Sequence, residues 1–255
     1  MPDWNPALYS RFEEQRTRPA RELLDRVSLP AARTILDVGC GPGNSTELLV
    51  ARYPAARVIG IDTSEAMIAT ATKRVPAATF VLADAAAYEA RDVDLVYSNA
   101  TLQWVPDHER LIPRLMQMLA PGGTLAVQMP DNLAEPTHAL LPPLTARFHI
   151  APDLRYDRVL SAERYYDLLS PHGDTDVWTT IYRHPMADPA AIVEWVRATG
   201  LRPVLDALPV ERHAEFLAAY EAELATAYPR RADGNRLLAY PRLFFTLSRV
   251  ITQRS

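Results

Sequence analysis

Apolar positions in the first half of the chain form short runs that alternate with longer amphipathic segments. The runs have the length and content of buried strands, and the segments between them have helical periodicity. This alternation is typical of a parallel sheet covered on both faces, so it predicts an α/β fold. The expected strands are residues 35–38, 57–62, 79–84, 93–99 and, after a Pro-Gly-Gly turn, the end of 119–127.

The pattern changes after residue 129, where repeated prolines predict loops and short helices. A strand pattern returns at 177–183, and the apolar segment 243–250 is expected to pair with it antiparallel at the sheet edge. Two helical stripes between these segments are expected to form a small cap over the strand ends. Their positions are Ile192, Trp195, Val196 and Thr199, then Phe216, Leu217, Tyr220 and Leu224. Trp195 is expected to pack in the core.

We expect one domain with four parts. Residues 1–30 are predicted to be helical, with an amphipathic segment at 19–27, and to form a lid. Residues 31–130 form the α/β core, 131–175 a Pro-rich insertion, and 176–255 the end of the sheet with the cap helices. A chain of 255 residues with 48% hydrophobic content can fill one large core without a second domain.

The first expected strand leads into a loop with glycines at alternate positions, Gly39, Gly41 and Gly43. Glycine permits positive φ and lets a ligand approach the main chain, because no Cβ intervenes. Asn44 follows as a candidate N-cap of the next helix, with Glu47 as its capping-box partner. Strand, tight loop and helix together predict a cofactor-binding loop.

Asp37, at the end of this strand, separates two classes of cofactor. A dinucleotide places its pyrophosphate at the helix N-terminus, where an adjacent carboxylate is repulsive. S-adenosylmethionine has no phosphate and carries a sulfonium and an ammonium group, which an acidic residue favours. The glycine spacing also differs from the G-x-G-x-x-G pattern of nicotinamide and flavin enzymes. The loop alone favours the methyl donor and leaves a dinucleotide open.

Two further acids end the next strands. Asp62 follows the glycine loop by about twenty residues, where α/β folds place a carboxylate that holds ribose hydroxyls. Asp84 ends the third strand and is suited to accept a hydrogen bond from an adenine amino group. Because open α/β sheets bind ligands at the carboxyl ends of their strands, three acids at successive ends predict a site.

These ordered segments resemble the motif series of class I S-adenosylmethionine-dependent methyltransferases. Further stretches resemble the family of bacterial enzymes that methylate trans-aconitate; the resemblance covers nearly the whole chain and thins between about residues 145 and 163. They are DWNP at 3–6, NATLQW at 99–104, QMPDN at 128–132, EPTH at 135–138, TGLRP at 199–203 and PRLF at 241–244. The resemblance implies a Rossmann-like, seven-stranded sheet with helical cap insertions. It also implies S-adenosyl-L-methionine as cofactor, S-adenosyl-L-homocysteine as product, and a monomethyl ester of trans-aconitate, a small polycarboxylate.

The resemblance assigns cofactor contacts to residues at the strand ends. Asp37 and the Gly39 to Gly43 loop would hold the methionine end, and Asp62 the ribose. Thr63 and Met67 would flank the adenosine, Asp84 and Ala85 would contact the adenine, and Asn99 and Ala100 would lie near the methionyl group. Asn44, directly after the glycine loop, is a further expected cofactor contact.

The acceptor chemistry requires little from the protein besides alignment. A carboxylate acceptor is already ionised at pH 7, so no catalytic base is expected. The segment after the fourth strand lacks the Asn/Asp-Pro-Pro-Tyr/Phe tetrapeptide of many nitrogen methyltransferases, which favours oxygen as the acceptor atom. Trp104 is expected to orient the reacting carboxylate through its indole N–H. The candidate carboxylate clamps are Arg202, which is expected in a loop beside the cap, Arg18 and Arg242.

Composition limits the partners. A net charge of -4 argues against nucleic acid, and the longest uncharged stretch, residues 115–130, is too short to span a membrane. The single cysteine, Cys40, and the lack of a secretory pattern at residues 1–4 lead us to expect a cytoplasmic enzyme. The six histidines are scattered, so no metal site is expected, and each is expected to be solvent-exposed or locally hydrogen-bonded. No obligate protein partner is evident.

Three alternatives remain open at this point. A nicotinamide oxidoreductase is disfavoured by the loop spacing and by Asp37. A methyltransferase-like module that binds without catalysis would also lack an evident catalytic dyad. Within the methyltransferases, the acceptor can be another carboxylate or a hydroxyl group.

Overall fold

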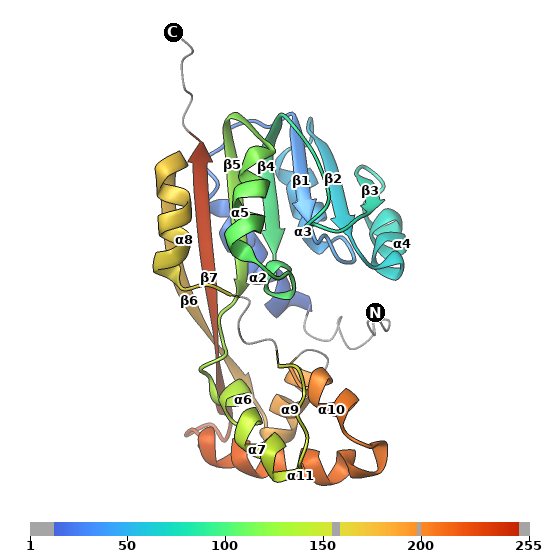
Figure 1. Cartoon of the computed structure of the whole chain (residues 1–255), viewed down its shortest axis with the longest axis vertical. Helices are drawn as coiled ribbons and strands as arrows, with labels where there is room; N and C mark the ends of the chain where they lie inside the picture. Colours follow the sequence, from blue (N-terminus) through green and yellow to red (C-terminus); the bar gives the residue numbers. More distant parts are fainter. Residues whose placement is uncertain (1–12, 155–158, 198–199, 250–255) are drawn as a thin grey trace.

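A mixed sheet of seven strands forms the centre of the described structure (Figure 1). The computed structural model describes residues 13–154, 159–197 and 200–249, with side chains from Thr17 onward. The first five strands are parallel, whereas β7 runs antiparallel to both of its neighbours. The spatial order is β3 (Thr79–Leu82), β2 (Arg57–Asp62), β1 (Thr34–Val38), β4 (Val93–Asn99), β5 (Leu119–Pro130), β7 (Arg236–Arg249) and β6 (Gly173–Met186). The seven-stranded α/β prediction is confirmed.

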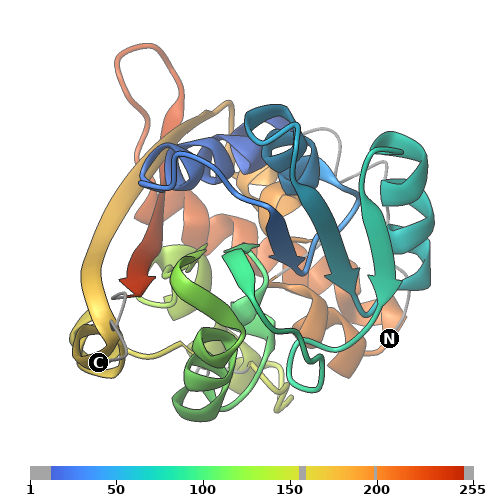
Figure 2. The ribbon, with the colours of Figure 1, turned by 90° about the horizontal axis from the view of Figure 1, so that it is seen from above.

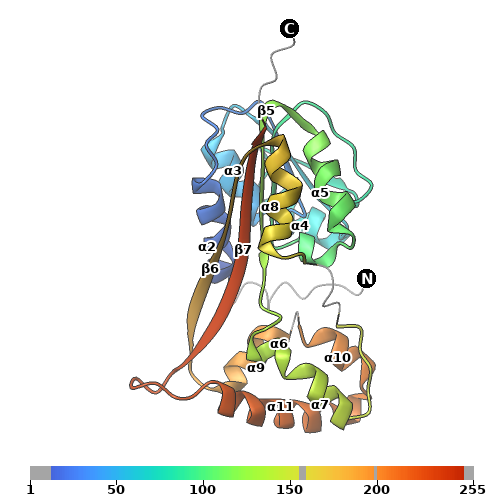
Figure 3. The same cartoon turned by 60° about the vertical axis from the view of Figure 1, so that its left-hand side comes forward.

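Helices cover both faces of this sheet (Figure 3). On one face, α2 (Glu13–Asp25) and α3 (Asn44–Arg52) contribute Leu23 and Leu49 to a core that includes Tyr97 and Phe244. On the other face, α5 (His108–Gln117) and α8 (Ala162–Leu169) pack on a second apolar core. The helix α4 (Glu65–Arg74) packs against β2 and β3. Figure 2, which looks down on the sheet, shows β6 at one edge and β3 at the other.

A second group of helices forms a cap at the carboxyl ends of the parallel strands (Figure 1). Buried Trp195 and Phe216 lie on its two main helices, which confirms both predicted stripes within the described residues. Thr199, the last position of the first stripe, lies outside them. The cap helices are α6 (Pro136–Ala139), α7 (Leu141–Arg147), α9 (Pro189–Arg197), α10 (Arg202–Ala207) and α11 (His213–Ala227). The described residues also form the short 3-10 turns η1 (Leu102–Trp104), η2 (Ser170–His172) and η3 (Val210–Arg212).

The long antiparallel pair β6–β7 joins the sheet to the cap. Its register runs from Gly173 opposite Arg249 to Met186 opposite Arg236. The predicted antiparallel pairing is confirmed, although both strands are longer than the predicted ranges. Exposed and partly buried positions alternate along β6 and form no long apolar run. For this reason the sequence pattern predicted only the central part of the strand, residues 177–183.

The structure bears on three further predictions, and one of them differs from it. The Pro-Gly-Gly turn at 121–123 lies inside β5 as an irregularity, because pairing with β4 shifts between Val93 and Leu95. Within the expected insertion 131–175, the predicted short helices are confirmed: α6 and α7 pack in the cap, and α8 (Ala162–Leu169) packs against the sheet. The expected lid begins in residues 1–12, which lie outside the described part; α2 itself covers the sheet beside α3.

No helix in the described ranges combines the length and the apolar content that a membrane crossing requires.

A buried hydrogen bond fixes α2 to the sheet. The Tyr97 hydroxyl on β4 donates to the Ala20 carbonyl oxygen at 2.6 Å, and Tyr97 is 1% exposed. This bond positions α2 over the ends of β4 and β5, where polar residues of the sheet meet.

We therefore predict that Tyr97→Phe lowers the free energy of unfolding by about 1 kcal/mol, since it removes one buried hydrogen bond and little apolar surface. Thermal denaturation should show a Tm lower by about 2–4 °C. Tyr166→Phe is the matched control, because Tyr166 is 52% exposed. Equal melting of both variants would contradict the role given to this bond.

Candidate cofactor and substrate site

The glycine loop after β1 takes a shape that other residues resist. Gly39, Gly41 and Gly43 have φ of 72°, 53° and 96°, as their expected role requires. A Cβ on Gly39 would lie 2.0 Å from the Thr101 side chain, so the loop packs directly on the segment after β4. A Cβ on Gly41 would meet no described atom within 4 Å. The backbone at Gly41 therefore borders open space in which a ligand can lie.

Asp62 at the end of β2 connects the glycine loop to α4. Its Oδ2 accepts a hydrogen bond from the Gly41 N–H at 3.0 Å, and its Oδ1 accepts one from the Ser64 N–H at 2.9 Å. Each carboxylate oxygen can accept a second bond. Asp62 is therefore placed beside the open space at Gly41, with acceptor capacity left for hydroxyl groups.

The residues expected at the adenosine lie along the ends of β2 and β3. Thr63 is exposed and Met67 is 8% exposed in the first turn of α4. Asp84 is exposed, and its Oδ1 accepts from the Ala86 N–H at 2.8 Å. Ala85 is buried beside it. The carboxylate of Asp84 therefore fixes its own turn in this structure.

Asp37 is fully buried and points toward α3. Its Oδ2 accepts hydrogen bonds from the hydroxyls of Ser45 at 2.8 Å and Thr46 at 2.6 Å. Its Oδ1 is buried without a hydrogen-bond partner among the described residues. Burial raises the pKa of Asp37 to about 6, and the two hydroxyls oppose this rise. A buried acceptor without a donor is suited to the ammonium group of the expected methyl donor.

The start of α3 corrects the capping prediction. The N-cap is Gly43 in a left-handed conformation, and Asn44 is the first helical residue. Glycine takes this position because the loop requires positive φ there. The Asn44 amide donates to the Thr17 hydroxyl of α2 at 3.5 Å, and Glu47 forms an ion pair with Arg74 at 2.9 Å instead of a capping box.

The end of β4 brings a further unpartnered oxygen to the same region. Asn99 Oδ1 is buried and accepts no hydrogen bond from the residues described. Ala100 has φ of 54°, a strained value for a residue with a Cβ, and its N–H donates to the Gln128 carbonyl oxygen at 2.8 Å. The Thr101 hydroxyl donates to the Gly39 carbonyl oxygen at 3.0 Å. These hydrogen bonds hold the strained turn against the glycine loop.

Trp104 lies on η1, directly after that turn, and is 39% exposed. Buried His108 supports η1 from behind, because its Nε2 lies 2.9 Å from the Leu102 carbonyl oxygen. A carbonyl only accepts, so Nε2 carries the proton and Nδ1 accepts from the Tyr165 hydroxyl. Of the two expectations for each histidine, solvent exposure or local hydrogen bonding, buried His108 shows the second.

Of the three candidate arginines, Arg242 is the one buried at the sheet, with 4% exposure. Its Nη1 donates to Gln128 Oε1 at 3.1 Å, and its guanidinium carbon lies 4.9 Å from the centre of the Tyr240 ring. Gln128 is fully buried at the end of β5. Gln128 belongs to the QMPDN segment of the family resemblance, but no functional role was predicted for it. A glutamine within an apolar strand could have indicated a buried polar contact.

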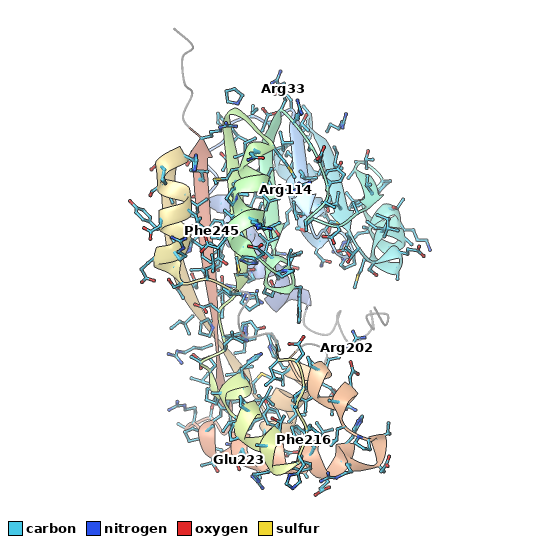
Figure 4. The ribbon with its side chains drawn as sticks, in the orientation of Figure 1. Arg33, Arg114, Arg202, Phe216, Glu223 and Phe245 are labelled. Atoms are coloured by element: carbon cyan, nitrogen blue, oxygen red, sulfur yellow. The ribbon has the colours of Figure 1, made fainter. Side chains whose placement is uncertain are left out.

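Arg18 and Arg202 take different positions. The Arg18 side chain on α2 is 64% exposed, pairs with Glu22 at 2.7 Å and lies 5.0 Å over the Tyr182 ring. Arg202 was expected in a loop and is the first residue of α10, because the proline after it favours a helix start. Its Nε lies 3.7 Å from Asp206. Figure 4 shows Arg202 on the side of the cap that faces the sheet.

The structure thus brings Asp37, Gly41, Asp62 and Asn99 to the ends of β1, β2 and β4. Arg242 on β7 contacts Gln128 of β5, whose register partner on β4 is Asn99. Trp104 lies on the adjoining turn, Asp84 and Ala85 lie toward the β3 edge, and Arg202 lies on the cap.

Comparison with known proteins matches residues 35–123 to the family described as "Methyltransferase domain". The chain is 58% identical over 252 residues to the trans-aconitate 2-methyltransferase of Variovorax paradoxus (strain S110), covering 96% of this chain and 97% of that protein. It is 57% identical over 261 residues to the trans-aconitate 2-methyltransferase of Paracidovorax citrulli (strain AAC00-1), covering 98% and 99%.

Solved structures share the fold at low identity. A putative methyltransferase from Bacillus halodurans aligns with a TM-score of 0.60 and 13% identity over 91% of this chain and 99% of that one. Phosphoethanolamine N-methyltransferase 2 of Haemonchus contortus, in complex with S-adenosyl-L-methionine, aligns with a TM-score of 0.56 and 19% identity. The chain spans about half of that protein, 52%, with 91% of its own length.

The aligned region covers nearly the whole of this chain and of each relative, so it includes the cap as well as the sheet. The chain belongs to the trans-aconitate 2-methyltransferase family.

Proposed function

We propose that this chain transfers the methyl group of S-adenosyl-L-methionine to one carboxylate of trans-aconitate, forming a monomethyl ester and S-adenosyl-L-homocysteine. The observation that carries this proposal is the identity of 57–58% to relatives of that name across the cap as well as the sheet. The fold supports the donor, and the near full-length identity supports the acceptor. The same relatives disfavour the oxidoreductase that the sequence left open.

The residues at the strand ends fit the donor. We assign the ammonium group to Asp37 Oδ1, which is buried and lacks a donor in the described structure. The Gly41 backbone borders the open space that the sulfur-bearing chain would fill, and Asp62 has acceptor capacity for the ribose hydroxyls. Asn44, Thr63, Met67, Asp84, Ala85, Asn99 and Ala100 stay as proposed contacts around the remaining atoms.

The proposed reaction requires alignment rather than proton transfer. When bound, S-adenosylmethionine supplies an electrophilic methyl group on a sulfonium. The acceptor carboxylate is ionised at neutral pH and loses no proton, so the chain needs no base at the reacting oxygen. The tasks of the protein are to hold the carboxylates, with Arg242, Arg202, Arg18 and Trp104 as proposed contacts, and to exclude water.

The proposed partner is a small molecule, with no nucleic acid, membrane or obligate protein partner. We also propose action in the cytoplasm, which rests on sequence features such as the single cysteine, Cys40, which is buried.

The direct test is incubation of the purified protein with methyl-labelled S-adenosylmethionine and a panel of small polycarboxylates. We expect labelled monomethyl ester and S-adenosylhomocysteine with trans-aconitate. Binding of S-adenosylhomocysteine without methylation of any acceptor would indicate a binding module instead. Binding of NADH with no response to S-adenosylhomocysteine would contradict the methyl donor.

We predict that Gly41→Ala weakens S-adenosylhomocysteine binding at least about tenfold, or about 1.4 kcal/mol, because its Cβ enters the space assigned to the ligand. Titration calorimetry measures this. Gly234→Ala is the matched control: Gly234 also has positive φ, 84°, and its Cβ would meet no described atom within 4 Å. Both variants lose about 1 kcal/mol of stability from backbone strain. Equal affinities in the two variants would move the ligand away from Gly41.

The Asp37 assignment predicts pH-dependent binding. The pKa of this carboxyl is raised by burial to about 6, from 3.8, so its ionised form destabilises the folded protein increasingly as pH rises from about 4 to 6. An ammonium group offsets this cost when the carboxylate is ionised. The affinity for S-adenosylhomocysteine should therefore increase roughly tenfold between about pH 5 and 7.

Calorimetry of wild type and Asp37→Asn across this range provides the check. The variant should bind more weakly at pH 7 and lose most of the pH dependence, because the amide stays neutral. The same pH profile in both proteins would show that a group other than Asp37 controls it, which would contradict the Asp37 assignment.

A further inference from the structure

Gln128 combines full burial with an unsatisfied hydrogen-bond donor. It is 0% exposed at the end of β5, and its Nε2 has no hydrogen-bond partner among the residues that the structure describes. A buried amide without an acceptor costs about 1–3 kcal/mol, so such groups are rare unless a ligand completes them.

Arg242 determines which way this amide faces. Its Nη1 lies 3.1 Å from the Gln128 side chain, and a guanidinium can only donate. The atom that faces Arg242 is therefore Oε1, and the NH₂ group must face away from it. One glutamine thus holds the guanidinium with its oxygen and leaves two N–H donors for another acceptor.

The surroundings of Gln128 place it at the acceptor end of the site. It lies in register with Asn99 on β4, and its carbonyl oxygen accepts from the Ala100 N–H at 2.8 Å. The side-chain nitrogen of Asn132, which is 4% exposed just after β5, is a second buried donor without a partner in the described ranges. The guanidinium of Arg242 and the amide of Gln128 therefore offer several donors near the end of β5, which suits an anion with several oxygens.

Resting on the proposed function, we infer that Gln128 is a specificity-determining residue that donates through Nε2 to a carboxylate of the acceptor, while its Oε1 holds Arg242 against the same carboxylate. A neutral amide serves here because it adds donors without cancelling the charge of Arg242. A polycarboxylate therefore finds a positive, donor-rich end to the site, although the chain has a net charge of -4.

Gln128→Glu tests this inference with almost no change in shape. The added carboxylate pairs with Arg242 and repels the acceptor, so the KM for trans-aconitate should rise at least thirtyfold. The Kd of S-adenosylhomocysteine should stay within twofold, and the Tm should not fall. A merely structural Gln128 predicts the opposite result, because a glutamate there forms an ion pair with Arg242 and leaves the KM unchanged.

Gln128→Met is the second variant, with a similar side-chain length and no charge, in case the first does not fold. It should raise the KM about tenfold with little change in the Kd of S-adenosylhomocysteine. Gln117→Glu is the charge control, because Gln117 is exposed on α5, and its kinetics should match wild type.

The outcomes separate this inference from the proposed function. A wild-type protein that does not methylate trans-aconitate contradicts the proposed function. An active wild type with an unchanged KM in every folded Gln128 variant overturns the inference alone.

Discussion

Hydrogen bonds between parallel strands hold the ends of β1, β2 and β4 at one level of the sheet. In this register, Asp37 on β1 lies between Gly60 on β2 and Tyr97 on β4. The loops that follow must then pack on one another: Gly39 donates to the Ile61 carbonyl oxygen at 2.8 Å and accepts from the Thr101 hydroxyl. A site at this edge is therefore a consequence of strand pairing, because the loops that follow β1, β2 and β4 all begin there.

The antiparallel pair β6–β7 adds what the parallel strands lack. Parallel strands stop at the site, whereas β7 continues past β5 into the cap and carries buried Arg242 on the face that α2 covers. The same strand pair thus supplies a cation and supports the cap helices. The two parts of the proposed site, donor and acceptor, therefore share one sheet face beneath α2, which Tyr97 fixes to β4.

Local patterns predicted the parts of the fold that depend on nearby residues. Alternate glycines indicated a positive-φ loop, and apolar stripes indicated α9 and α11, because both signals lie within a few residues. The prediction of Asn44 as N-cap was wrong, since Gly43 adopts the left-handed conformation needed for the loop. The length of β6 depends on its pairing with β7, and the start of α10 at Arg202 depends on the proline that follows it. Hydrophobic periodicity contains neither signal.

The site was harder to predict than the fold. Acids at strand ends pointed to Asp37 and Asp62, yet the sequence could not show that Oδ2 of Asp37 is occupied by two hydroxyls and Oδ1 is left without a partner. Gln128 gave no signal beyond its place in an apolar run, because its meaning depends on Arg242, 114 residues away. Such pairs become visible only when the strands are placed side by side.

In this account, the methyl donor and trans-aconitate together supply the missing hydrogen-bond partners of buried polar atoms at the strand ends. A crystal structure of the protein with S-adenosylhomocysteine and trans-aconitate tests it most directly. The account predicts ligand atoms within hydrogen-bond distance of Asp37 Oδ1, Asn99 Oδ1 and Gln128 Nε2. Both ligands bound elsewhere, with these three atoms still without ligand partners, would contradict it.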